Sequence, residues 1–224
     1  MKIIYCRGGS KTAPSVATKA NVFLGARHDY KTYSEIHMLD INWKAVTWHE
    51  FMEKVFELRP TMALAPDFEH PSQFRQLCQQ IYDLESAGVP EILICPKFVG
   101  AIDYIPTRCI VALSVPAPSY AGFLPDLRQL TGRKVHLLGG RADMSKRISQ
   151  AEIIIKLNGL DADVVSIDNS HVSVAAGHGR WFDGNRWIQA PRNTVASHDL
   201  EIASLQGISR YLGEMKKYTQ PLLI

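Results

Sequence analysis

The chain has 224 residues and a formal net charge of +3, with 46% hydrophobic and 21% charged residues, as expected for a globular protein with a sizeable core. No stretch approaches the ~20 apolar residues of a membrane span, and the apolar run at residues 3–6 is too short for a secretory signal. The scattered cysteines form no C-x-x-C pair, which argues against a zinc ribbon or a disulfide framework. We therefore expect a single domain over residues 1–224 in a reducing cytoplasm, that of the host if a phage encodes the chain.

Short apolar runs alternate along the chain with longer segments of helical periodicity. The strand candidates are residues 3–6, 22–24, 37–41, 62–65, 92–95, 110–115, 135–138 and 164–167. The helix candidates are residues 47–58, 71–87, 143–157 and 200–217. Continuous apolar runs are typical of parallel strands covered on both faces, and the alternation indicates right-handed βαβ units. The pattern predicts a small or degenerate (β/α)8 TIM-like barrel, with a doubly wound open sheet as the alternative.

In both architectures the reactive groups belong at the carboxyl ends of the strands, so the residues that follow each apolar run form the candidate site. Asp168 ends one run, and Asp67 follows another. An acidic residue in this position suits a nucleophile or a base, and two carboxylates can divide covalent attack from proton transfer. The structural alternative is a helix cap or a turn at each position.

Other side chains with ligand-binding chemistry lie at or just after the ends of the strand candidates. The residues predicted to bind substrate are Phe68, Lys97, Ser114, Tyr120, Gly139, Gly140 and Asn169. The two aromatic rings can stack on a planar ligand, the lysine can pair with a phosphate or a carbonyl, and the glycine pair lets a ligand approach the backbone closely. For each, the alternative is ordinary: a packing ring, a surface lysine and a helix-entry turn.

Residues 180–187 contain an Asp-Gly pair flanked by aromatic and basic residues, which predicts a β-hairpin. Arg180 and Arg186 in this segment, and Arg141 in a second basic stretch, are candidates for contact with nucleic acid, while a hairpin that covers the barrel end is the alternative. The histidines show no H-x-x-x-H or H-E-x-x-H spacing, so the sequence predicts no metal site, and it indicates no cofactor.

Residues 135–140 (Val-His-Leu-Leu-Gly-Gly) and 163–168 (Asp-Val-Val-Ser-Ile-Asp) resemble the corresponding stretch of the tRNA-guanine transglycosylases. In that family a His-Leu-Leu-Gly strand end precedes the strand with the aspartate nucleophile. The closer resemblance is to the DpdA-type deazaguanine DNA transglycosylases. It is carried by residues 5–9, 96–97, 114–116 and 120–122.

The resemblance implies an enzyme that replaces guanine in DNA with a 7-deazaguanine, such as 7-cyano-7-deazaguanine. It implies that Asp168 displaces guanine at C1′ and forms a covalent glycosyl intermediate. Asp67 would act as general acid/base or recognise the base, the glycine pair would line the base pocket, and Phe68 or Tyr120 would stack on the purine. The chain is shorter than the tRNA enzymes and lacks their C-x-C-x-x-C zinc site, which favours DNA as the partner or a pared-down enzyme.

Two other functions stay open at this point. One is a nucleoside N-glycosidase or deoxyribosyltransferase, which uses the same carboxylate chemistry on free nucleosides. The other is a non-catalytic nucleic-acid-binding accessory protein. The sequence also leaves open whether the chain forms a homodimer or works with an accessory protein.

Overall fold

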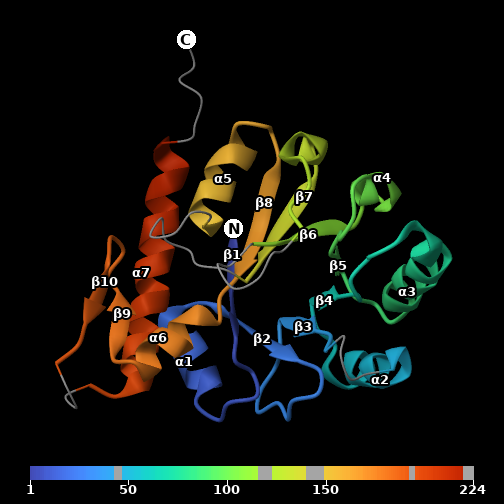
Figure 1. The fold of residues 1–224 in the computed structure, drawn as a ribbon. Helices are drawn as coiled ribbons and strands as arrows, with labels where there is room; N and C mark the ends of the chain where they lie inside the picture. The colour runs from blue at the N-terminus through green and yellow to red at the C-terminus, as the bar shows by residue number, and fades with distance from the viewer. Residues whose placement is uncertain (43–46, 116–122, 140–148, 192–194, 219–224) are drawn as a thin grey trace.

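The computed structural model describes residues 1–42, 47–115, 123–139, 149–191 and 195–218, and its centre is a closed barrel of parallel strands (Figure 1). The strands are β1 (Lys2–Cys6), β2 (Phe23–Arg27), β3 (Met38–Asp40), β4 (Met62–Leu64), β5 (Glu91–Ile94), β6 (Ile110–Ser114), β7 (Lys134–Leu138) and β8 (Asp163–Asp168). They are arranged in chain order, and β8 closes the barrel by pairing with β1, with Ile4 opposite Asp168. The predicted TIM-like barrel is confirmed, and the doubly wound sheet is excluded.

Helices cover the outside of the barrel (Figure 1). They are α1 (Ala13–Ala20), α2 (Trp48–Leu58), the 3₁₀ helix η1 (Pro71–Gln73), α3 (Phe74–Ser86), α4 (Ala101–Tyr104), the 3₁₀ helix η2 (Leu127–Leu130), α5 (Gln150–Asn158), α6 (His171–Gly177) and α7 (Ser197–Tyr218). The connection from β2 to β3, described over its full length at residues 28–37, contains no helix, so the barrel is degenerate there. In the part of the chain described above, no helix is both long and apolar enough to cross a membrane.

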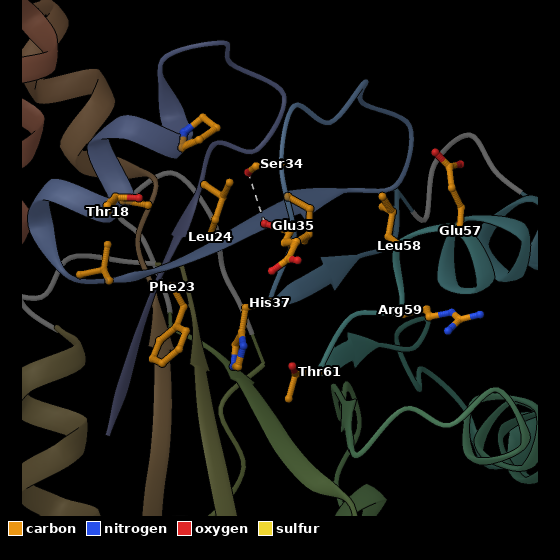
Figure 2. A pocket seen from close by; sticks show the side chains of 14 residues that line it. Thr18, Phe23, Leu24, Ser34, Glu35, His37, Glu57, Leu58, Arg59 and Thr61 are labelled. Atoms are coloured by element: carbon orange, nitrogen blue, oxygen red, sulfur yellow. Dashed lines mark hydrogen bonds between the residues drawn. The ribbon is translucent and has the colours of Figure 1, made fainter.

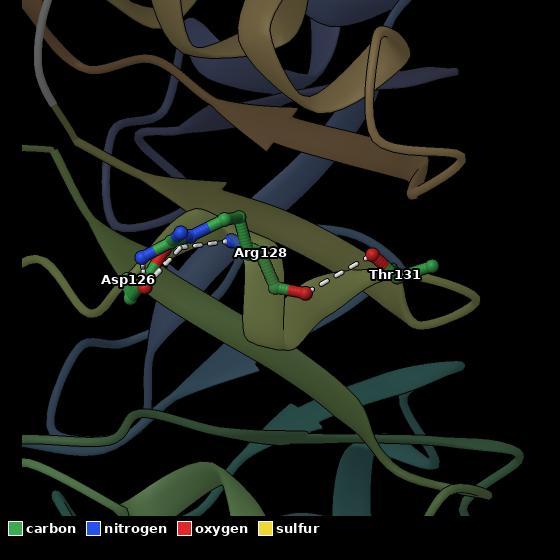
Figure 3. Close-up of polar contacts among 3 residues, drawn as sticks. All are labelled: Asp126, Arg128 and Thr131. Atoms are coloured by element: carbon green, nitrogen blue, oxygen red, sulfur yellow. Dashed lines mark hydrogen bonds and ion pairs between the residues drawn. The ribbon is translucent and has the colours of Figure 1, made fainter.

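The short helix η2 precedes β7, and its residue Arg128 makes polar contacts with the flanking residues Asp126 and Thr131 (Figure 3). The Asp126 carboxylate accepts a hydrogen bond from the backbone N–H of Arg128 at 3.0 Å and pairs with the guanidinium of the same residue. The hydrogen bond from the Arg128 side chain is the main cause that lowers the pKa of Asp126. At the other end, the Thr131 hydroxyl donates to the carbonyl of Arg128 at 3.0 Å. These exposed contacts add little stability, but they explain where the chain turns before β7.

After α6 the chain forms the predicted hairpin, made of β9 (Arg180–Phe182) and β10 (Trp187–Gln189). The Asp183 carboxylate closes its turn by accepting hydrogen bonds from the backbone N–H groups of Asn185 and Arg186. The hairpin packs on α7, where the Phe182 N–H donates to the Ser204 hydroxyl at 3.1 Å.

Gly207 lies on α7 directly under this hairpin. A Cβ at this position would come 2.1 Å from the carbonyl oxygen of Phe182 and 2.9 Å from the nitrogen of Gly184. We expect Gly207→Ala to lower the free energy of unfolding by about 1–3 kcal/mol, because the hairpin must move away from the helix. Chemical denaturation measures this. In the matched control Gly213→Ala, on the same helix, the new Cβ meets nothing within 4 Å, so helix propensity alone should add about 0.5–1 kcal/mol. Equal effects of the two substitutions would contradict the close contact.

Candidate active site

Several strands place a polar side chain at the carboxyl-end mouth of the barrel, although the barrel interior below them is largely apolar. Every second side chain of a strand points to the same face, so the residue two positions beyond an inward-facing one faces the mouth. By this rule four side chains face the mouth: Cys6 beyond Ile4, Asp40 beyond Met38, Ser114 beyond Ala112 and Asp168 beyond Ser166. Four strand ends therefore contribute two carboxylates, a thiol and a hydroxyl to one opening.

Asp168 ends β8 and has defined hydrogen-bond partners. Its carboxylate accepts hydrogen bonds from the backbone N–H of Gly139 and from the thiol of Cys6. The buried amide of Gln150 donates to the carbonyl oxygens of Asp168 at 2.7 Å and Gly139 at 2.6 Å, so α5 ties the ends of β7 and β8 together. Burial raises the pKa of Asp168 to about 6, and the two hydrogen bonds to its carboxylate oppose this rise.

Gly139 follows β7 with a φ of +63°, in the left-handed region that glycine adopts without a steric cost. This turn directs its N–H to the carboxylate of Asp168. The sequence suggested that Gly139 and Gly140 line a pocket for a base. Gly139 contacts the predicted nucleophile itself, and Gly140 lies outside the described residues.

Asp40 is a second carboxylate of this mouth, and the sequence analysis did not identify it. Burial, followed by the nearby charge of Asp168, raises the pKa of Asp40 to about 7. The available signal was the segment Met38–Asp40, in which an acid ends a short apolar run as Asp168 does in β8. It was missed because the strand candidate extended over residues 37–41, which placed the acid inside the strand instead of at its end.

Asp40, Asp168 and Cys6 line one cavity of about 590 Å³. Its other walls come from the end of β2, the loop after β1 and the loop between β2 and β3, together with Ser170 after β8. This volume is within the range of small-molecule sites. Burial, followed by the charges of Asp168 and Asp40, raises the pKa of Cys6 well above its usual range. The thiol therefore stays protonated at neutral pH and serves as a hydrogen-bond donor, not as a nucleophile.

His136 lies inside the barrel below this mouth, with its Nδ1 2.7 Å from the hydroxyl of Ser166. Burial lowers the pKa of His136 to about 3, so the ring is neutral. It joins β7 to β8 where their register shifts, one step below Asp168. We therefore regard His136 as a structural residue of the barrel.

Asp67 belongs to another polar cluster, on the side of the mouth formed by β4, β5 and β6. Its carboxylate lies 3.2 Å from Nζ of Lys97, which donates to the hydroxyl of Ser114 at 2.8 Å. The structure thus brings together three of the predicted site residues. The Asp67 carboxylate is engaged in an ion pair, however, and does not line the cavity of Asp168.

Two residues predicted to bind substrate have structural roles instead. Phe68 is only 2% exposed and packs edge-on against Phe98 and Tyr104, with ring centroids 4.9 Å and 6.0 Å apart. No face of its ring is open to a purine, so the stacking prediction for Phe68 is corrected. Asn169 is also 2% exposed, and its side-chain oxygen accepts the backbone N–H groups of His171 and Val172. It caps the first turn of α6.

Arg180 and Arg186 lie exposed on the β9–β10 hairpin, which packs against α6 and α7. Neither lines the cavity of Asp168. Tyr120 and Arg141 fall outside the described residues.

A larger hollow of about 880 Å³ lies away from this mouth (Figure 2). Phe23, His37 and Thr61 line it, at or just before the first residues of β2, β3 and β4, and the rings of Phe23 and His37 are 4.3 Å apart. It is therefore on the amino-end side of these strands, next to the connection without a helix. Barrel enzymes carry out their chemistry at the carboxyl ends, so we assign the candidate active site to the smaller cavity.

Comparison with known proteins identifies the family of this chain. The model of DUF6610, described as a family of unknown function, matches residues 17–213. The chain belongs to the DUF6610 family. No curated protein matches this DUF6610 chain at a significant level.

Solved structures resemble the DUF6610 chain in fold. The structure of the IolI protein with a binding zinc atom has a TM-score of 0.55 and 8% identity, over 99% of this chain and 100% of that one. The Amycolatopsis orientalis BexX/CysO complex has a TM-score of 0.50 and 12% identity, over 100% of this chain and 94% of that one. At such identities the likeness shows the barrel fold alone. Within the described residues of the DUF6610 chain, no group of three or more His, Cys, Asp or Glu side chains is placed to hold a metal ion.

Proposed function

We propose that this DUF6610 protein is a base-exchange transglycosylase that replaces guanine in DNA with a 7-deazaguanine such as 7-cyano-7-deazaguanine. The proposal is carried by one observation: Asp168 and Asp40 share a cavity, with pKa values raised to about 6 and about 7. Carboxylates whose environments separate their pKa values divide the roles of nucleophile and acid–base catalyst. The choice of guanine in DNA comes from the resemblance of residues 135–140 and 163–168.

In the first half-reaction Asp168 is the nucleophile. It has the lower pKa and accepts hydrogen bonds from Gly139 and Cys6, so it is the ionised member of the pair near neutral pH. Its oxygen bonds to C1′ while the bond from C1′ to N9 of guanine breaks, and the electron pair leaves with the base. Asp40 keeps its proton to higher pH and donates it to the departing guanine. The carboxylate of Asp168 stabilises the positive charge that develops on the sugar.

In the second half-reaction the 7-deazaguanine takes the place of guanine. The Asp40 carboxylate accepts the proton from its N9, N9 bonds to C1′, and the bond from C1′ to Asp168 breaks with its electron pair returning to the carboxylate. One base leaves and one enters, so no further reactant is consumed. A guanine in duplex DNA must first be flipped out of the base stack to reach this cavity. We assign Lys97 and Ser114, across the mouth, to binding of the substrate.

The test is incubation of the protein with radiolabelled 7-cyano-7-deazaguanine and, in parallel reactions, either a guanine-containing DNA oligonucleotide or free deoxyguanosine. We expect the label in DNA and release of one guanine for each label incorporated. Label that enters free deoxyguanosine but not DNA would identify a deoxyribosyltransferase, and guanine release without incorporation would identify an N-glycosidase. DNA binding with no guanine release from any of these substrates would overturn the proposal in favour of an accessory protein.

A further inference from the structure

We propose that Arg7 and Lys31 form a phosphate-binding subsite at the outer edge of the cavity, so that the substrate is a nucleotide held by its phosphate and not a free nucleoside. The identity of the sugar and base rests on the proposed function. The subsite itself rests on the two loops that form the cavity wall and on their charges.

The two loops pack closely against each other. A Cβ on Gly8 would come 2.5 Å from the Cβ of Ala26, and a Cβ on Gly9 would come 2.9 Å from the side chain of Tyr30. The loop after β1 therefore lies directly on β2 and on the loop that follows it. One cation of each loop, Arg7 and Lys31, lines the cavity from this wall.

A third cation of the wall, Arg27, already has a partner. Its guanidinium donates two hydrogen bonds to the Asp29 carboxylate, at 2.7 Å and 2.8 Å, and lies 4.4 Å from the ring centre of Tyr30. Arg7 and Lys31 are exposed, and within the described chain neither forms an ion pair with a carboxylate. The wall therefore has two positive charges that no acidic side chain of the described residues neutralises.

The cavity is thus polarised, with carboxylates on the strand ends and unpaired cations on the loops. A phosphate is repelled by the ionised Asp168 and attracted by Arg7 and Lys31. A sugar that gains positive charge at C1′ is stabilised by that same carboxylate. A nucleotide has both features, anionic at the phosphate and cationic at C1′ in the transition state. A free nucleoside has only the second, and it offers no anion to the two cations, of which Lys31 lies over the ring of Tyr33, with its Nζ 5.8 Å from the ring centre.

The first test measures binding to an Asp168→Asn protein, which cannot complete the reaction. We expect deoxyguanosine 5′-monophosphate to bind at least roughly tenfold more tightly than deoxyguanosine. Arg7→Gln and Lys31→Gln should each weaken binding of the monophosphate by roughly tenfold and leave deoxyguanosine binding unchanged. Lys11→Gln is the matched control, because Lys11 is an exposed cation of the same loop that does not line the cavity. Equal binding of the two ligands, or equal loss in all three variants, would overturn the subsite.

A second arm identifies the source of the phosphate. A single-stranded oligonucleotide with one guanine is compared with the same strand carrying an uncharged methylphosphonate next to that guanine. If the ligand is a DNA strand, the neutral linkage and the Arg7→Gln substitution should weaken binding by similar factors. Each should also make the negative slope of log K, the association constant, against log salt concentration less steep by about 0.7. If only the monophosphate depends on Arg7 and Lys31, the substrate is a free nucleotide. Arg7-dependent binding without base exchange would support the subsite and refute the proposed function, whereas base exchange that is insensitive to Arg7 and Lys31 would do the reverse.

Discussion

Replacing Asp168 with asparagine is expected to abolish base exchange, with a fall in rate of roughly 10⁴-fold or more, because the amide cannot form the glycosyl ester. The asparagine can still accept the N–H of Gly139, so the strand end should keep its geometry. The direct measurement is a protein–DNA adduct that survives denaturation when the incoming base is withheld. We expect this adduct in the wild-type protein, attached to the peptide that contains Asp168, and none in the variant.

The matched control for this experiment is Asp163→Asn, at the amino end of the same strand. Asp163 is exposed and lies away from the mouth, so its replacement should leave adduct formation unchanged. An adduct that persists in Asp168→Asn, or that maps to Asp40, would show that a different group attacks the sugar.

Asp40→Asn is expected to slow release of guanine by roughly 10²–10⁴-fold, the usual contribution of a general acid. The defect should depend on the leaving group. A 7-methylguanine base already carries a positive charge while it is attached to the sugar. It therefore departs as a neutral molecule without receiving a proton. Its release should therefore be nearly as fast in Asp40→Asn as in the wild-type protein, whereas Asp168→Asn should remain inactive on both substrates. An equal loss on the two substrates would exclude the acid role of Asp40.

The pH profile tests the same division of labour in the unsubstituted protein. Asp168 must be ionised, so the rate should fall as the pH drops through about 6, and Asp40 must be protonated, so the rate should fall again as the pH rises through about 7. The two limits belong to the interacting pair. With the 7-methylguanine substrate the alkaline fall should disappear and the acidic fall should remain. A guanine-releasing rate that stays constant above pH 8 would contradict a protonated Asp40.

The same substrates decide between Asp40 and Asp67, the residue that the sequence favoured. Asp67 is paired with Lys97, so Asp67→Asn should have similar effects on release of guanine and of 7-methylguanine. If the rate of base release by Asp67→Asn is instead the one that the 7-methylguanine substrate restores, the general acid is Asp67.

Several features follow from the local sequence alone. The apolar runs predicted the barrel strands because burial on both faces requires consecutive apolar side chains. The same reasoning located Asp168 at a strand end, where a carboxylate can reach the mouth without crossing the core. The Asp-Gly turn predicted the hairpin of β9 and β10, since its backbone preference is a property of the turn residues themselves. Each of these depends on residues that are neighbours in the chain.

The tertiary structure decided which predicted residues meet. Asp40 shares the cavity of Asp168 because their strands, far apart in sequence, both direct every second side chain inward. Asp67 is drawn to Lys97, and Phe68 is covered by Phe98 and Tyr104, through contacts between different elements that no local pattern encodes. The sequence thus determined the strands and one carboxylate of the candidate site. The identity of the second carboxylate was decided by the closure of the barrel, because closure sets which strand ends share the mouth and partly buries their side chains.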